Sequence, residues 1–130
     1  MHYMLDTEIG SYLIRGDHPC VTKKFTELYE KCVISSITAA ELQYGARKRN
    51  NRTLTQKVQA LCDLIPIIPW NEVAAGNYAK LRVELETAGT PIGNMDMMIA
   101  ASAIAENVTL LTNNTEHFSK IASLKLEDWC

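Results

Sequence analysis

The chain has 130 residues, of which 47% are hydrophobic and 22% are charged, and its formal net charge is −2. This length and composition fit a single folded domain over residues 1–130, and no apolar run approaches the roughly 18 residues that a membrane span needs. Because the first residues carry no basic segment and soon reach an acid, Asp6, a secretory signal is excluded, and we expect a cytoplasmic protein without a membrane partner.

The first half of the chain predicts a β-α-α-β opening followed by two helices. Apolar runs and helical spacings place strands at 2–5 and 32–35, with helices over about 9–13 and 21–29 between them. A third helix follows to about residue 49, with Ser36 or Thr38 as its N-cap, and a fourth spans about 53–64. The last two could form a hairpin. Gly45 weakens the third helix unless a neighbour packs closely against it.

The second half continues the alternation of strands and helices. Residues 65–69 are β-branched but interrupted by proline, which favours an edge strand. A long helix over about 71–87 is ended by Gly89. Asn94 is placed to cap the next helix, which is apolar nearly all round and therefore packs between the sheet and its neighbours. A strand at 108–112 and a short one within 121–126 complete the pattern. Such alternation predicts an α/β fold with a parallel sheet covered on both faces.

Cysteine and basic residues give weaker signals. The four cysteines form no C-x-x-C pair and have no zinc-ligand spacing to the three histidines, so we expect reduced structural thiols at Cys20, Cys32, Cys62 and Cys130. The net charge argues against a broadly basic nucleic-acid surface, and any such contact must be local. The one dense basic group comprises Arg47, Lys48, Arg49 and Arg52. It fits either a solvated helix end or an RNA-binding patch.

Three acids from distant parts of the chain form the main functional clue. Asp6 ends the first strand, and Glu41 and Asp96 lie in early turns of predicted helices. Because parallel strands all end at the same edge of a sheet, these carboxylates can meet there, where open α/β sheets bind ligands. Asp6 could equally serve only as a helix N-cap, and Asp96 only as an acid favoured by the helix dipole.

A cluster of carboxylates at such an edge suits Mg²⁺ or Mn²⁺, which prefer oxygen ligands and bind phosphates. A metal-bound water would then attack a phosphodiester without a nucleophilic side chain. This agrees with the lack of a G-x-S-x-G elbow, a Walker P-loop or an H-E-x-x-H motif. A second ion would need a further oxygen donor, for which Asn114, Glu116 and Glu8 are candidates.

Four segments, taken together and in order, resemble the motifs of the PIN-domain VapC toxins of bacterial toxin-antitoxin systems. They are residues 4–7 (MLDT), 34–46 (ISSITAAELQYGA), 91–101 (PIGNMDMMIAA) and 111–118 (LTNNTEHF). Each segment alone is weak evidence, whereas four at the right separations are specific. The ending at 126–129 (LEDW) is also similar to members of this family.

The resemblance implies a three-layer α/β/α PIN fold and an endoribonuclease that depends on Mg²⁺ or Mn²⁺. It also implies a homodimeric toxin that cuts tRNA, inhibits translation and is neutralised by a VapB antitoxin. Several members cut initiator tRNA in its anticodon loop. Carried over residue by residue, Asp6, Glu41 and Asp96 match the metal-binding acids. The accompanying polar positions are Thr7, Glu8, Asn94, Thr112 and Asn114.

Two of these positions depart from the family pattern. Many relatives carry Asn where this chain has Glu8, which adds a carboxylate at the edge of the groove, either as a metal ligand or as a group that repels RNA. Asn114 stands where a fourth acid is common and supplies an oxygen without charge, which favours one resident ion.

Two other functions compete with the nuclease. A strand-end aspartate also occurs in phosphatases and phospho-acceptor domains, but the later strand-end lysine of those proteins is missing, and Glu8 stands where phosphatases place a second Asp. The other alternative is a PIN-like domain that binds RNA or a protein without cutting. The presence of all three acids counts against it. The apolar helices that carry Tyr12, Tyr29, Leu61 and Leu64 fit ordinary core packing, a homodimer interface or an antitoxin helix.

Overall fold

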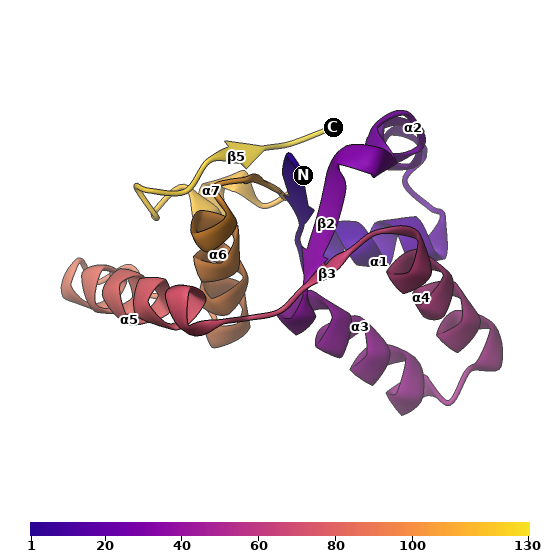
Figure 1. Ribbon diagram of the computed structural model, residues 1–130, viewed down its shortest axis with the longest axis horizontal. Helices are drawn as coiled ribbons and strands as arrows, with labels where there is room; N and C mark the ends of the chain where they lie inside the picture. Colours follow the sequence, from indigo (N-terminus) through magenta and orange to yellow (C-terminus); the bar gives the residue numbers. More distant parts are fainter.

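A five-stranded parallel β-sheet forms the middle layer of the computed structural model, which describes residues 1–130 (Figure 1). The strands are β1 (Tyr3–Leu5), β2 (Cys32–Ser35), β3 (Ile67–Ile68), β4 (Thr109–Leu111) and β5 (Leu126–Glu127). Their order is β3-β2-β1-β4-β5, and every neighbouring pair is parallel. This confirms the predicted α/β class, and β3 lies at an edge as the prolines beside it require.

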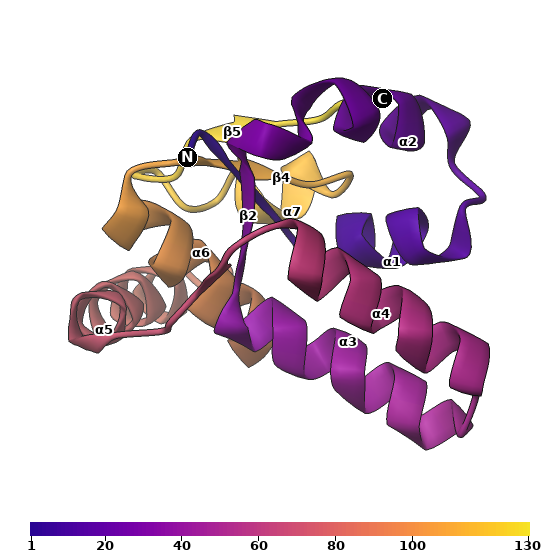
Figure 2. The same ribbon diagram turned by 45° about the vertical axis from the view of Figure 1, so that its right-hand side comes forward.

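Helices cover both faces of the sheet and give the three-layer arrangement expected from the resemblance. The helices are α1 (Thr7–Arg15), α2 (Pro19–Leu28), α3 (Ser36–Arg49), α4 (Arg52–Leu64), α5 (Glu72–Thr87), α6 (Asn94–Glu106) and α7 (Thr115–Phe118), with a 3₁₀ turn at Tyr29–Lys31. Figures 1 and 2 show α1 to α4 on one side of the molecule and α5 and α6 on the other. Helices α3 and α4 form the predicted hairpin. None of the helices is both long and apolar enough to cross a membrane.

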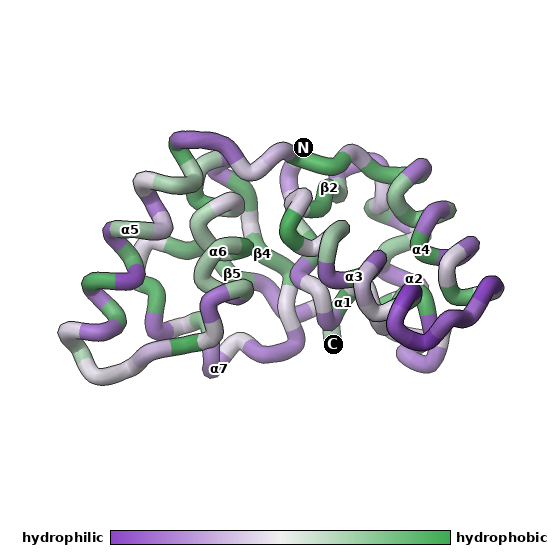
Figure 3. Tube along the Cα trace, turned by 90° about the horizontal axis from the view of Figure 1, so that it is seen from below, coloured by the Kyte–Doolittle hydropathy of each residue, from purple (hydrophilic) through white to green (hydrophobic).

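Alternate residues of each strand face opposite layers. Met4 belongs to the core under α5 and α6, whereas Leu5 belongs to the core under α1 to α4. Leu5 also pairs in register with Ile34 and Leu111 on the two neighbouring strands. Successive side chains point to opposite faces of a strand, so a single strand contributes to both cores. In Figure 3 the trace through α5 alternates between hydrophobic and hydrophilic residues, as expected of a helix with one packed face.

Several predicted element ends were wrong by one or more residues. Ser35, not Ser36 or Thr38, caps α3, and its hydroxyl accepts a hydrogen bond from the Ile37 amide at 3.1 Å. Gly93 occupies the N-cap position of α6, so Asn94 is the first helical residue. The last strand starts at Leu126, later than predicted, because the residues before it form turns that fill the core beneath α7.

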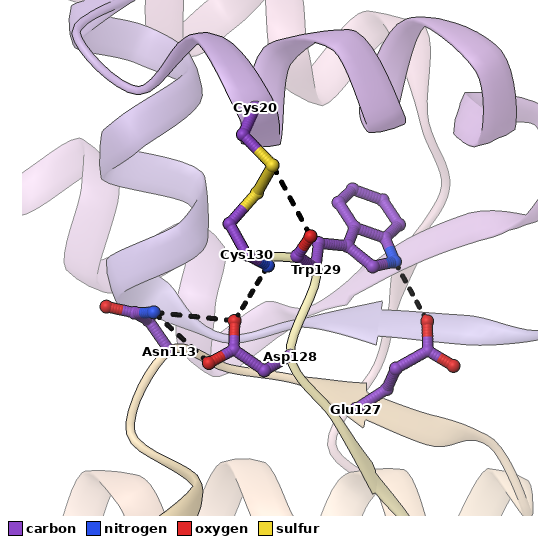
Figure 4. Close-up of a disulfide and its surroundings, with 6 residues drawn as sticks. All are labelled: Cys20, Asn113, Glu127, Asp128, Trp129 and Cys130. Atoms are coloured by element: carbon purple, nitrogen blue, oxygen red, sulfur yellow. Dashed lines mark hydrogen bonds between the residues drawn. A yellow bond between two sulfur atoms is a disulfide. The ribbon is translucent and has the colours of Figure 1, made fainter.

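The expectation of four reduced thiols was also wrong. Cys20, at the start of α2, forms a disulfide with Cys130, which follows β5 (Figure 4). The two Cα atoms lie 6.2 Å apart although 110 residues separate them in sequence, so only the folded topology reveals the pair. Cys32 and Cys62 remain free, and burial raises the pKa of the Cys32 thiol to about 12. The disulfide joins the end of the chain to the layer formed by α1 to α4.

Candidate functional site

The candidate site lies where the strand order of the sheet reverses. From β1 the chain adds β2 and β3 on one side, and later adds β4 and β5 on the other. Asp6 directly follows β1 and Thr112 directly follows β4, so both lie at the carboxyl ends of the two strands that flank the reversal. The Asp6 amide donates a hydrogen bond to the Leu111 carbonyl at 3.0 Å. This is the place where open parallel sheets bind their ligands.

Asp6 is a buried carboxylate with a second, structural role. Its Oδ1 accepts a hydrogen bond from the Ile9 amide at 2.8 Å, so it caps α1. Burial raises the pKa of Asp6 to about 6, although hydrogen bonds from Thr112 and Ile9 act in the opposite direction. The negative charges of Glu8 and Asp96 are smaller contributions to the same rise in pKa. Asp6 therefore caps α1, as the simpler interpretation predicted. Its pKa also depends on the charges of the other acids of the predicted site.

Glu41 reaches the same edge from α3. The hydroxyl of Thr7, the residue after Asp6, donates a hydrogen bond of 2.6 Å to Glu41 Oε1. Thr7, the neighbour of Asp6, thus contacts Glu41 across 34 positions of sequence. Both Thr7 and Glu41 are partly buried, and both line the same cleft.

Asp96 lies in the first turn of α6, and its carboxylate meets a histidine that sequence reasoning gave no role. His117 Nε2, from α7, lies 3.1 Å from Asp96 Oδ2. The Asp96 side chain is 40% exposed, so it can still face solvent or a ligand. The two residues are 21 positions apart, and nothing in their local spacing predicts the contact.

The chemistry of these donors fits a divalent cation. Of the acids at this edge, Asp6, Glu8 and Glu41 form no ion pair with Lys or Arg, so their mutual repulsion has no cationic partner within the chain. The carboxylates are instead held by Thr7, the Ile9 amide and His117. In these positions no three Asp, Glu, His or Cys side chains form a finished metal cage. The ligand set therefore stays a prediction.

The remaining predicted positions surround this edge. Thr112 is fully buried, and its hydroxyl accepts a hydrogen bond from the Asn114 amide at 3.0 Å. Asn114 and Asn94 are exposed. Glu8 is exposed and accepts a hydrogen bond from the Tyr12 hydroxyl at 2.8 Å. Thr112 therefore shapes the loop after β4, whereas Asn114 and Glu8 are free to face a ligand.

Sequence reasoning missed a link between this loop and the end of the chain. The Asn113 amide group donates to the Asp128 carboxylate at 3.3 Å, and the Cys130 amide donates to the same carboxylate at 3.0 Å (Figure 4). Trp129, between them, is buried, and its indole donates to Glu127. Only the similarity of the ending at 126–129 pointed to this segment. The disulfide thus fixes a tail that contacts the loop beside the candidate site.

Comparison with known proteins identifies the fold and its chemistry. Residues 3–124 match the PIN domain. The chain is 44% identical to Ribonuclease VapC2 of Rickettsia felis, over 99% of this chain and 98% of the relative. It is 34% identical to the tRNA(fMet)-specific endonuclease VapC of Shigella flexneri, again over 99% and 98%. The chain belongs to the VapC family of PIN-domain ribonucleases.

Solved structures place the same fold in other VapC proteins. A crystal structure of VapBC2 from Rickettsia felis bound to a promoter DNA fragment matches with a TM-score of 0.92 at 39% identity, covering 100% of both chains. DNA-bound VapBC from Salmonella typhimurium matches with a TM-score of 0.91 at 31% identity, over 100% of this chain and 99% of that chain. Membership of the VapC family makes this chain a nuclease and sets aside the phosphatase and non-catalytic alternatives.

Proposed function

We propose that this VapC-family ribonuclease is a toxin that hydrolyses tRNA with a divalent metal ion held by Asp6, Glu41 and Asp96. The observation that carries the proposal is the buried Asp6 carboxylate. Its pKa is raised to about 6 by burial and by neighbouring acids, and no Lys or Arg pairs with it. A protein gains nothing in stability from such repulsion, whereas a bound divalent cation removes it.

Each residue has a defined part in this proposal. Asp6, Glu41 and Asp96 would hold Mg²⁺ or Mn²⁺, with Asn114 as a further oxygen donor, and the ion would supply an activated water and neutralise charge on the phosphate. Thr7 orients Glu41 through its 2.6 Å hydrogen bond. His117 orients Asp96 in the same way. Thr112 donates to Asp6 and fixes the loop that presents Asn114.

The names of the relatives support a choice of substrate and of protein partner. Those from Shigella flexneri and Salmonella typhimurium are named tRNA(fMet)-specific endonucleases, which makes initiator tRNA the first substrate to test and inhibition of translation the expected effect. The related crystal structures contain VapBC complexes, so we expect a VapB antitoxin as a partner. The family resemblance also implies a homodimeric toxin in the cytoplasm. A groove lined by Leu13, Phe25, Leu61 and Leu64 offers an apolar surface for a partner helix.

End-labelled initiator tRNA tests the proposal. We expect the purified protein to cut this tRNA in the presence of Mg²⁺ or Mn²⁺ and to lose this activity in EDTA. Asp96→Asn should lower the rate by more than about 100-fold, because a direct ligand matters at least as much as the groups that orient it. Glu72→Gln is the matched control, since Glu72 is also an acid in the first turn of a helix but lies on α5. Cleavage that persists in EDTA, or equal loss in both variants, would contradict the proposal.

A further inference from the structure

A cleft between α1, α3 and α4 starts at the candidate site and leads away from it. One wall is a stripe on α1 made of Thr7, Ser11 and Arg15. The other is a stripe on α3 made of Glu41, Gly45 and Arg49. Residues four apart on a helix lie on the same side, so each stripe runs straight along its helix. Eight residues of helix span about 12 Å, which is the length of each wall.

The two ends of the cleft have opposite character. At the first end, Thr7 and Glu41 are joined by their hydrogen bond beside Asp6. At the far end each wall finishes with an arginine, Arg15 on α1 and Arg49 on α3. The floor between the walls is apolar and includes Leu42 from α3 and Val58 from α4.

The guanidinium groups at the far end are available to a ligand. Arg49 forms no ion pair in the structure, and neither do its basic neighbours Arg47 and Arg52. Arg15 pairs with Asp17 at 3.0 Å, but both side chains are about half exposed, and such a pair contributes little in water. The protein as a whole is slightly acidic, so this basic end is a local feature rather than a consequence of composition.

Gly45 keeps the middle of the cleft open. It lies between Glu41 and Arg49 on the α3 wall, and a Cβ added there would meet no atom within 4 Å. Nothing packs against this glycine, so close packing is not its reason. A glycine inside a helix costs about 1 kcal/mol relative to alanine. Glycine at position 45 therefore weakens α3 at the point where a larger side chain would project into the cleft.

We propose that this cleft holds the RNA strand next to the bond that is cut, with Arg15 and Arg49 binding its phosphates. This inference rests on the proposed function, because the first end of the cleft is the candidate metal site. A phosphate chain would meet the cation at the acidic end and the two arginines at the other, which fixes the direction of the strand. Arginine matches phosphate geometry with paired hydrogen bonds, and the apolar floor can take a base. The charges along the cleft thus favour RNA over an acidic peptide, because only RNA would bind both the cation and the arginines through its phosphates.

A pair of arginine variants tests the phosphate contacts. Arg47 and Arg49 both lie in the last turn of α3, but Arg47 lines other grooves that do not reach Glu41. We expect Arg49→Gln to raise KM for tRNA by about 5- to 10-fold with little change in kcat, since it removes a charge-assisted hydrogen bond away from the reacting phosphate. The slope of log Kd against log salt should fall by about one. Arg47→Gln should change neither.

A pair of glycine variants tests the path of the strand. Gly45→Leu should strengthen α3, because leucine favours helix over glycine, and yet weaken RNA binding by filling the cleft. Gly76→Leu, in the middle of α5 with equally open surroundings, should stabilise the protein without affecting RNA. Binding is measured by fluorescence anisotropy with labelled tRNA in the Asp96→Asn background, so that the RNA is not cut.

The outcomes separate this inference from the proposed function. If the wild-type protein does not cut tRNA in any metal, the proposed function fails. If it cuts tRNA but Arg49→Gln behaves like Arg47→Gln and Gly45→Leu binds RNA normally, only the cleft assignment is overturned. Loss of binding to a polyglutamate peptide in Arg49→Gln, with RNA binding unchanged, would assign the cleft to an acidic protein segment and overturn it as well.

Discussion

The two helical layers of this protein differ in how closely they pack. In the layer of α5 and α6, Ala100, Ala101 and Ala103 are fully buried, and α6 packs against α5 and the sheet. In the layer of α1 to α4, the helices leave a cleft between them, and Gly45 adds no side chain to fill it. The first layer holds Asp96 in a fixed place. The second layer carries the groups that we assign to RNA recognition.

The two layers have different tasks. Small side chains let α6 approach the sheet closely, so the acid in its first turn is set by dense packing. The other layer gives up some contact between helices in exchange for an open surface, and the Cys20–Cys130 disulfide joins this looser layer to the end of the chain.

Removal of the disulfide should have the largest effect on stability. The bond spans 110 residues, so its loss frees nearly the whole unfolded chain, and Cys20→Ser should lower the free energy of unfolding by up to about 4 kcal/mol. Cys62→Ser, which alters a free thiol, is the control. Urea unfolding followed by circular dichroism measures both variants. A wild-type midpoint that does not move on adding dithiothreitol would contradict this expectation.

Filling the packed layer should have the next largest effect. Ala100→Leu should lower stability by about 1–3 kcal/mol, because α6 has no room there for a larger side chain. Ala40→Leu makes the same change at an exposed position of α3, where we expect less than about 0.5 kcal/mol. Similar losses in the two variants would show that dense packing around Ala100 is not the cause of the effect.

A change at the site should have the smallest effect on stability, and in the opposite direction. Asparagine also caps helices, so Asp6→Asn should keep the cap on α1 while removing a buried charge. The pKa shift corresponds to about 3 kcal/mol at pH 7, but the asparagine amide is itself a buried polar group, so the net gain for the metal-free protein should be about 1 kcal/mol. The folded pKa of about 6 lies above the ordinary 3.8, so the folded state binds more protons between these values. Wild-type stability therefore falls as pH rises from about 4 to 6.

The gain from Asp6→Asn should accordingly vanish below about pH 4, where Asp6 is protonated in both states. Thermal melts in EDTA at pH 4 and pH 7 measure it, with Glu72→Gln as the control. A gain of the same size at both pH values would show that the charge of Asp6 is not its cause.

The sequence predicted the parts of this fold that depend on local pattern. Strand β1 and the position of Asp6 follow from a short apolar run that ends in an acid, and α6 follows from its nearly continuous apolar residues. The contact of Thr7 with Glu41 was not predictable in detail, but the meeting of their elements at one sheet edge was. Local spacing in the sequence is sufficient to predict a feature that lies within a single helix or strand.

Contacts between distant segments were not predictable in the same way. Cys20 and Cys130 carry no pairing signal in their surroundings, and His117 meets Asp96 only because α7 folds back beside α6. The Asn113 contact with Asp128 likewise depends on where β4 and β5 end. Such contacts follow from the topology as a whole, which a single sequence does not spell out.

We propose that three distant carboxylates share one divalent ion. Anomalous diffraction from a crystal grown with Mn²⁺ tests it directly. We expect a single strong peak within bonding distance of Asp6, Glu41 and Asp96, with the Glu41 and Asp96 carboxylates turned towards it. The claim is contradicted if no peak appears at saturating Mn²⁺ and the carboxylates still bind only Thr7, the Ile9 amide and His117.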